Sequence, residues 1–155
     1  MVSRVPKSIA IVLDGNRRFA KKLGLQPWKG HEFGLKKLED LFKWCMELGI
    51  KEITLYCFST ENFKRAKNEI NYLFGLFWKE FKKIQGSNST YRNRIKVNVI
   101  GRTYMFPQKM QKAMNDAVQK TNKNNELIVN FALAYGGRQE IVDAVNNILK
   151  NKKIE

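Results

Sequence analysis

Residues 9–18 read I-A-I-V-L-D-G-N-R-R, an apolar run that ends in an acid, a glycine, an amide and two arginines. The run from Ile9 to Leu13 is continuous rather than alternating, which predicts a strand buried on both faces, as strands of parallel sheets are. The polar residues that follow mark the carboxyl end of that strand. Ligands of open parallel sheets gather at the carboxyl ends of the strands. This stretch therefore indicates both a fold class and the place of a site.

The rest of the chain alternates between strand and helix patterns. Further strands are predicted at 53–58, 96–100 and 127–134. Helices are predicted at 17–22, 33–48, 68–84, from 107 to the break at 122–125, and after 138 to about 150, with a polar loop at 85–92. This alternation predicts an α/β fold, an open parallel sheet flanked by helices, and we interpret residues 1–155 as one domain.

The composition is strongly basic. The 155 residues carry a formal net charge of +15, which favours polyanionic partners such as nucleic acid, an acidic membrane surface or phosphorylated small molecules. The other interpretation is a solvated surface rich in lysine. Both readings stay open on composition alone.

Cysteine use and hydropathy narrow the setting. Cys45 and Cys57 lie in apolar surroundings, typical of reduced core residues, and with a single histidine they leave no zinc-site spacing. No stretch approaches the ~18 to 20 apolar residues of a membrane span. We therefore expect a cytoplasmic protein whose membrane contact, if it has one, is peripheral.

The residues after the first strand suit a phosphate. Gly15 lets the backbone approach a ligand closely, and Arg17 or Arg18 can bind a phosphate through two hydrogen bonds. Asp14 would repel that phosphate unless a divalent cation stood between them, and one carboxylate with phosphate oxygens and waters is a usual Mg²⁺ arrangement. The alternative is an ordinary Asp-Gly-Asn turn.

Two other strand ends carry polar motifs, S-T-E-N-F-K-R at 59–65 and Y-G-G-R-Q-E at 135–140. Turn chemistry explains glycine and asparagine there, but it does not explain an arginine in each. His31, the only histidine, follows Gly30 at a helix entry that favours anions. It could equally be a capping or core residue.

Taken together, these residues resemble the cis-prenyltransferase family, which includes undecaprenyl and dehydrodolichyl diphosphate synthases. The resemblance is carried in order by I-A-I-V-L-D-G-N-R-R-F-A-K-K at 9–22, G-H at 30–31, L-Y-C-F-S-T-E-N-F-K-R at 55–65 and A-Y-G-G-R at 134–138. It implies condensation of isopentenyl diphosphate onto an allylic prenyl diphosphate such as farnesyl diphosphate, with Mg²⁺ as the cofactor, to make a polyprenyl diphosphate.

The resemblance also implies roles for particular residues. Asp14 would be catalytic and hold Mg²⁺, and Asn62 matches a position assigned to proton acceptance. Because an amide is a poor base, we interpret Asn62 as a positioning group and expect diphosphate or water to take the proton. The implied substrate-binding residues are Gly15, Asn16, Arg17, Arg18, Phe19, His31, Ser59, Thr60, Glu61, Phe63 and Arg65.

The family grows its product in an apolar tunnel between the sheet and two helices. The residues expected to line it here are Leu41, Cys45, Cys57, Phe74 and Phe77, although an ordinary core explains each of them too. Family resemblance further implies a homodimer or a heteromer.

The sequence departs from the family at two places. Pro27 stands where many members have an arginine, and the chain stops where members continue into strands and an isopentenyl diphosphate site. We therefore expect the C-terminal strands and this second half-site to be absent from these residues, and weak or no condensation by this chain alone. Two alternatives follow: a non-catalytic prenyl-diphosphate-binding subunit that needs a partner chain, and a basic nucleic-acid-binding protein, which we disfavour because no nucleic-acid motif occurs.

Overall fold

The computed structural model describes residues 5–86 and 94–151. Its centre is a four-stranded parallel sheet in the order β1-β2-β4-β3. The strands are β1 (Ser8–Val12), β2 (Glu52–Ser59), β3 (Ile95–Ile100) and β4 (Leu127–Tyr135). The predicted open parallel sheet is confirmed, and the three motif-bearing strands are neighbours whose carboxyl ends meet at one edge.

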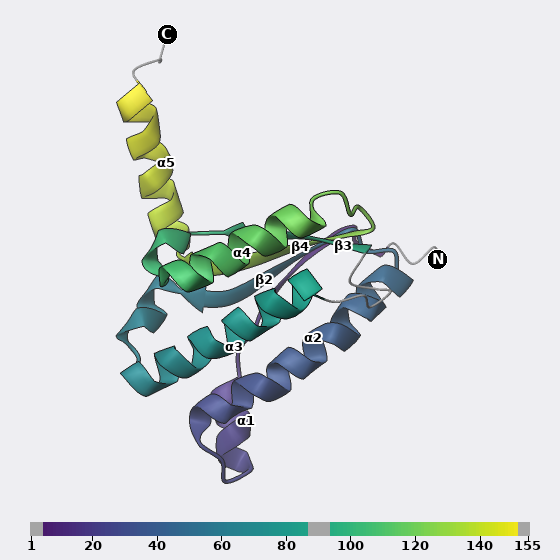
Figure 1. Ribbon diagram of the computed structural model, residues 1–155, viewed down its shortest axis with the longest axis vertical. Coiled ribbons are helices and arrows are strands. Elements are labelled where there is room, and N and C mark those ends of the chain that lie inside the picture. Colours follow the sequence, from purple (N-terminus) through teal and green to yellow (C-terminus); the bar gives the residue numbers. More distant parts are fainter. Residues whose placement is uncertain (1–4, 87–93, 152–155) are drawn as a thin grey trace.

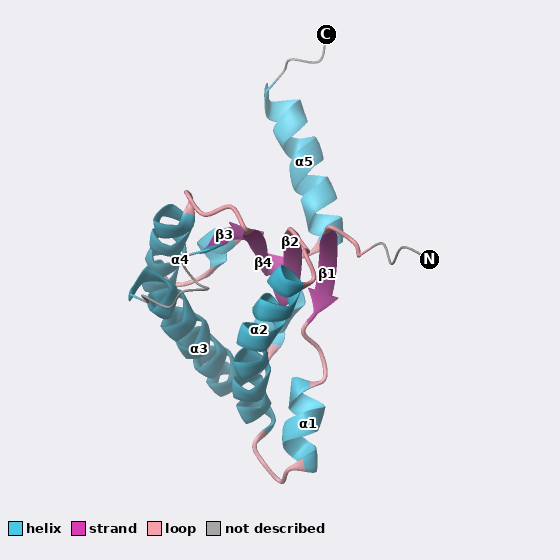
Figure 2. Ribbon diagram, turned by 90° about the vertical axis from the view of Figure 1, so that its right-hand side faces the viewer, coloured by secondary structure: helices cyan, strands magenta, loops and turns pink. Residues whose placement is uncertain are grey.

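The described residues form five helices: α1 (Asn16–Lys22), α2 (Gly30–Glu47), α3 (Lys67–Gly86), α4 (Gln108–Thr121) and α5 (Gly137–Asn151). Short 3₁₀ turns stand at Pro27–Lys29, Thr60–Lys64 and Thr103–Met105. Figure 2 shows α2, α3 and α4 together on one side of the sheet. This arrangement leaves α1 below the end of β1, where the first polar motif lies (Figure 1).

Several boundaries differ from the sequence expectation. Helix α2 begins at Gly30 rather than Phe33, because the 3₁₀ turn at Pro27–Lys29 runs directly into it. Pro107 precedes α4 as its N-cap instead of occupying its first turn. Helix α3 continues to Gly86, so the loop predicted at 85–92 begins later, and its residues 87–92 lie outside the described residues.

An aromatic cluster forms the core between the sheet and the helices. Phe58 of β2 is 1% exposed and lies 5.0 to 6.2 Å, ring centre to ring centre, from Phe63, Phe74, Phe77 and Phe106. Full burial of one such side chain contributes about 1.5 to 3 kcal/mol. The cluster therefore holds α3 against the sheet beside the site.

The opposite face of the sheet is polar. Asn130 donates from Nδ2 to Glu52 Oε1 at 2.7 Å, and Asn98 donates to Asn130 Oδ1 at 2.9 Å. On the same face Val12 of β1 is 68% exposed. The expectation that the first strand is buried on both faces is therefore wrong, because the described helices that pack on the sheet cover its other face.

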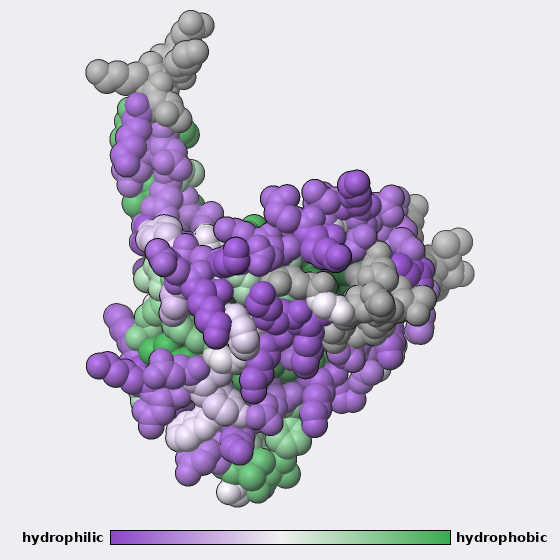
Figure 3. Space-filling model, viewed as in Figure 1, coloured by the Kyte–Doolittle hydropathy of each residue, from purple (hydrophilic) through white to green (hydrophobic). Residues whose placement is uncertain are grey.

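Helix α5 extends away from the body of the molecule (Figure 1). Its base is held by Arg102, whose guanidinium donates to both carboxylate oxygens of Asp143 at 2.7 and 2.9 Å. Figure 3 shows green, hydrophobic surface along this helix. The apolar side chains of α5 that are about half exposed or more are Ile141, Val142, Val145, Ile148 and Leu149. Over residues 5–86 and 94–151, we find no helix with the length and hydropathy of a membrane span.

Candidate functional site

The end of β1 displays Asp14 to solvent. Gly15 adopts a left-handed conformation with φ 88° and caps α1, which glycine does without a steric cost. The Gly15 N–H donates to Asp14 Oδ1, and Arg18 donates to Oδ2 at 3.1 Å. The Asp14 side chain is 77% exposed. An acid and an arginine are thus presented together at the carboxyl edge of the sheet.

Close backbone packing brings α2 to this edge. A Cβ atom on Gly30 would lie 1.9 Å from the Asn16 carbonyl oxygen, and one on Gly34 would lie 2.8 Å from Asn16 Oδ1. Only glycine at these positions lets the first turn of α2 touch the start of α1. The contact explains the Gly-His pair, because it places His31 beside the Asp14 motif.

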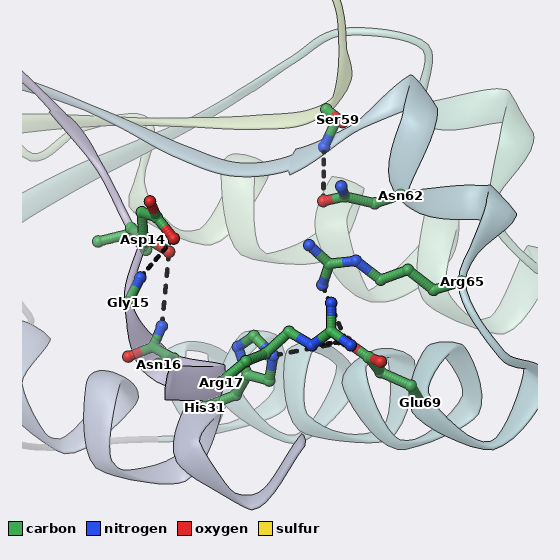
Figure 4. A network of polar contacts seen from close by, with 10 residues as sticks. Asp14, Gly15, Asn16, Arg17, His31, Ser59, Asn62, Arg65 and Glu69 are labelled. Atoms are coloured by element: carbon green, nitrogen blue, oxygen red, sulfur yellow. Dashed lines mark hydrogen bonds and ion pairs between the residues drawn. The ribbon is translucent and has the colours of Figure 1, made fainter. Parts of the chain in front are cut away.

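The buried carboxylate of Glu69 lies close to Arg17, His31 and Arg65 (Figure 4). Glu69 of α3 has a side chain only 5% exposed, and its Oε1 accepts a hydrogen bond from Arg65 at 3.1 Å. The same oxygen lies 3.5 Å from Arg17 Nε and 4.0 Å from His31 Nε2. Sequence reasoning missed Glu69. The signal available was its spacing of four residues from Arg65, a spacing at which opposite charges often pair, although Arg65 itself precedes α3.

His31 is held in its neutral form. Burial is the main cause that lowers the pKa of its imidazole, followed by the positive charge of Arg65; Glu69 acts in the opposite direction and Arg17 lowers the pKa further. His31 Nε2 is buried, and among the described residues it has no hydrogen-bond partner. A ligand oxygen that reached this nitrogen would supply one.

These side chains enclose a pocket of about 220 Å³. It is lined by Leu13, Asp14, Gly15, Asn16, Arg17, Arg18, His31 and Arg65. Seven of these eight residues were predicted to hold Mg²⁺ or substrate, so the structure brings the polar residues of 14–18 together with His31 and Arg65. Arg138, at the third strand end, does not line this pocket.

A larger groove of about 790 Å³ adjoins the polar pocket and shares Leu13, Asp14, Asn16 and His31 with it. Its remaining walls are mostly apolar and come largely from α2 and α3, for example Leu41 and Phe77, with Phe19 from α1 and Cys57 from β2. Burial raises the pKa of the Cys57 thiol to about 12, so this thiol carries no charge at neutral pH; the charged residues of the lining are Asp14, Lys36, Lys37 and Asp40. The polar pocket therefore opens into an apolar channel.

The groove confirms only part of the expected apolar lining. Leu41, Cys57 and Phe77 line it, but Cys45 and Phe74 line neither the groove nor the smaller cavity of about 80 Å³ beyond it. Cys45 is 1% exposed, and Phe74 packs 5.0 Å from Phe106 in the aromatic cluster. Both residues belong to the ordinary core, which is the alternative that the sequence offered for each of them.

The loop after β2 faces the Asp14 motif across the site (Figure 4). Asn62 Oδ1 accepts the Ser59 N–H at 3.2 Å in a capping box that shapes this loop. Hydrogen bonding from Ser59 is the main cause that lowers the pKa of the Glu61 carboxyl. Phe63 packs on Phe58 in the core. None of the residues predicted at 59–63 is among those that line the pocket.

The side chains of the polar pocket can bind Mg²⁺ only together with a phosphorylated ligand. Among the described residues there is no group of three or more His, Cys, Asp or Glu side chains that could hold a metal ion. Asp14 is the only carboxylate among the residues that line the polar pocket. Mg²⁺ keeps several waters and binds through one or two carboxylates together with substrate phosphates, so one acid suffices when a phosphorylated ligand is present.

The fold is an open parallel sheet with an arginine-lined pocket at the carboxyl ends of its strands, and comparisons with known proteins give its family. Residues 12–155 match the family model described as "Putative undecaprenyl diphosphate synthase". The chain belongs to this prenyltransferase family.

Individual relatives share most of this chain. It is 49% identical over 147 residues to a tritrans,polycis-undecaprenyl-diphosphate synthase (geranylgeranyl-diphosphate specific) of Thermococcus kodakarensis, covering 95% of this chain and 56% of the relative. An isoprenyl transferase of Thermus thermophilus is 41% identical and covers 94% of this chain, which in turn covers 55% of that protein. The chain therefore spans about half the length of these relatives.

The solved structure of a lavandulyl diphosphate synthase from Lavandula x intermedia, in complex with dimethylallyl diphosphate, has the same fold. The TM-score is 0.84 at 29% identity, over 93% of this chain and 61% of that chain.

Proposed function

We propose that this chain provides the allylic-diphosphate site of a Mg²⁺-dependent cis-prenyltransferase that makes a polyprenyl diphosphate. One observation carries the proposal: a pocket lined by three arginines and one exposed acid opens into an apolar groove of about 790 Å³. The arginine-lined pocket suits a diphosphate head group, and the apolar groove suits an isoprenoid tail. The names of the relatives, which are prenyl diphosphate synthases, support the same choice.

The proposed reaction breaks the allylic carbon–oxygen bond. The diphosphate leaves with the bonding electrons, the double bond of isopentenyl diphosphate attacks the allylic cation, and loss of a proton gives a cis olefin. Negative charge grows on the departing diphosphate, so fixed cations at that position stabilise the transition state. Arg17, Arg18 and Arg65 line the pocket where this charge would develop.

The remaining residues of the site orient and shield. Asp14 would hold Mg²⁺, which when bound neutralises charge on the diphosphate. His31 Nε2, buried and neutral, would hydrogen-bond a diphosphate oxygen. Asn62 would act through its capping box by fixing the loop opposite Asp14. The groove would keep water from the allylic cation, because its walls are mainly apolar.

The second substrate and the assembly belong to the proposal too. Because the chain spans 56% of the Thermococcus relative, we infer that the isopentenyl diphosphate site is completed outside these 155 residues, in further chain or in a partner of a homodimer or heteromer. The alternative of a prenyl-diphosphate-binding subunit without turnover rests on the same coverage. A lipid product and a charge of +15 favour peripheral contact with acidic membranes from the cytoplasm.

A condensation assay tests this function. The purified chain is incubated with Mg²⁺, radiolabelled isopentenyl diphosphate and either farnesyl or geranylgeranyl diphosphate, and extracted lipids are counted. We expect little product from the chain alone. We expect cis-polyprenyl products when the part of a relative that this chain does not span is supplied, and none when Asp14→Ala replaces the wild type.

Two results would contradict the proposal. Long products made steadily by the 155-residue chain alone would show that no further site is needed. Equal product formation by wild type and Asp14→Ala in the supplemented reaction would remove Asp14 from the chemistry.

A further inference from the structure

Glu69 stands behind the polar pocket rather than in its wall. Its partners Arg17, Arg65 and His31 all line the pocket, but Glu69 does not. Figure 4 shows the three side chains converging on its carboxylate from different segments: Arg17 from α1, His31 from α2 and Arg65 from the residues before α3. One buried oxygen therefore contacts three groups that a ligand would meet.

Electrostatics requires such a partner. Two guanidinium groups near one carboxylate oxygen repel each other. Each arginine side chain also loses conformational entropy when it is held in one rotamer. A buried carboxylate in turn is costly unless it is paired and hydrogen-bonded. Glu69 meets both conditions, because Arg65 hydrogen-bonds it at 3.1 Å while Arg17 lies at 3.5 Å.

We propose that Glu69 is a positioning residue that aims Arg17, Arg65 and His31 at the head group of a bound diphosphate. This inference rests on the proposed function, since it concerns the same pocket. Because Glu69 stays outside the wall, it does not compete with the ligand for space. Its effect is to order the two arginines before binding, which removes part of the ordering cost from the binding step.

The single histidine reports on this arrangement. The groups that face His31 are Arg17, Arg65 and Glu69, and of these only Glu69 acts to raise the pKa of the imidazole. Removing the Glu69 charge should lower that pKa further. A negatively charged diphosphate in the pocket should raise it. Because His31 is the only histidine of the chain, its NMR signals can be followed without assignment of others.

The test compares Glu69→Gln with Glu126→Gln. Glu126 also pairs with an arginine, Arg94, and lies outside the pocket lining, so this control removes the same charge from another Arg–Glu pair. Binding of inorganic diphosphate is measured by calorimetry in EDTA, and the His31 titration is followed by NMR. Thermal unfolding of all three proteins establishes that they are folded.

We expect Glu69→Gln to weaken diphosphate binding about tenfold, the lower end for residues that orient ligand-binding groups. The pKa of His31 should fall in this variant and stay at the wild-type value in Glu126→Gln. If Glu69→Gln does not fold, Glu69→Asp is measured instead. This variant keeps the negative charge on a side chain that is shorter by one methylene group, and it should also weaken diphosphate binding.

The possible failures are distinguishable. No binding of inorganic diphosphate by the wild type would overturn the proposed function. Binding by the wild type that is equal or stronger in the folded Glu69 variant would overturn only the positioning role. An unchanged His31 pKa in Glu69→Gln would overturn it as well, since the Glu69 charge would then not act on the groups of the pocket.

Discussion

At the residue scale, the fit of Gly30 against Asn16 decides where the site residues meet. The Asn16 carbonyl oxygen occupies the space that a Cβ atom on residue 30 would need. The glycine in the Gly-His pair is therefore required for packing, and His31 is placed as a consequence. The polar pocket depends on this contact, because it joins α1 to α2.

Gly30→Ala should destabilise the fold by about 1 to 3 kcal/mol, the cost of overpacking a closed contact. It should also weaken diphosphate binding, because α1 must shift away from α2. The matched control is Gly75→Ala in α3, where a Cβ meets nothing within 4 Å. That change should stabilise by about 0.5 to 1 kcal/mol, as alanine favours a helix interior. Urea unfolding measures both, and equal effects would contradict the packing role of Gly30.

The sequence predicted which residues at the end of the first strand belong to the site, but it did not predict Glu69, the carboxylate that pairs with Arg17. Asp14, Arg17 and Arg18 follow directly from the first strand, and the pocket contains all three. Glu69 lies in a helical segment where an acid usually means a solvated face. Its burial arises only when α1, α2 and α3 come together, which no local pattern specifies.

At the element scale, α2 and α3 form the apolar groove. Tyr72 of α3 donates to Glu32 of α2, and both helices supply apolar side chains such as Leu41 and Leu76 to the walls. The excess of apolar residues on α3 now has two destinations, the aromatic cluster and the groove. Helical periodicity shows the residues of the aromatic cluster and of the groove as one broad apolar stripe and does not separate them. Phe74 was therefore expected in the groove, although it lies in the core.

Leu41→Trp should narrow the groove without filling the core, because Leu41 is only partly buried and lines the groove. We expect weaker binding of farnesyl diphosphate and unchanged binding of inorganic diphosphate, which needs only the polar pocket. Leu48→Trp is the control at the end of the same helix, since Leu48 is 58% exposed and does not line the groove. Calorimetry with both ligands measures the effects.

Equal weakening of the binding of both ligands in Leu41→Trp would show a general disturbance of the fold. Equal weakening of farnesyl diphosphate binding in Leu48→Trp would contradict the groove as the site of the isoprenoid tail.

The order of the strands in the sheet is also a property of whole elements. Alternation of strands and helices predicted a parallel sheet, but β4 lies between β2 and β3. This order depends on long-range packing and is not visible in the periodicity.

At the scale of the whole molecule, the sheet is covered on one side by α2, α3 and α4 (Figure 2). The opposite side carries a hydrogen-bonded polar row, which the continuous apolar run of the first strand did not predict. The formal net charge of the chain is +15, and the polar pocket at the edge of the sheet is lined by Arg17, Arg18 and Arg65. Attraction of an anionic ligand is thus favoured both at long range and at the site.

The central claim is that Asp14 and Mg²⁺ act together on a prenyl diphosphate, and calorimetry of farnesyl diphosphate binding with Mg²⁺ and with EDTA tests it directly. Mg²⁺ should strengthen wild-type binding by about tenfold, roughly 1.4 kcal/mol. Asp14→Ala should lose this gain. In EDTA it should bind at least as tightly as the wild type, because the repelling carboxylate is gone. An equal gain from Mg²⁺ in both proteins would contradict the account.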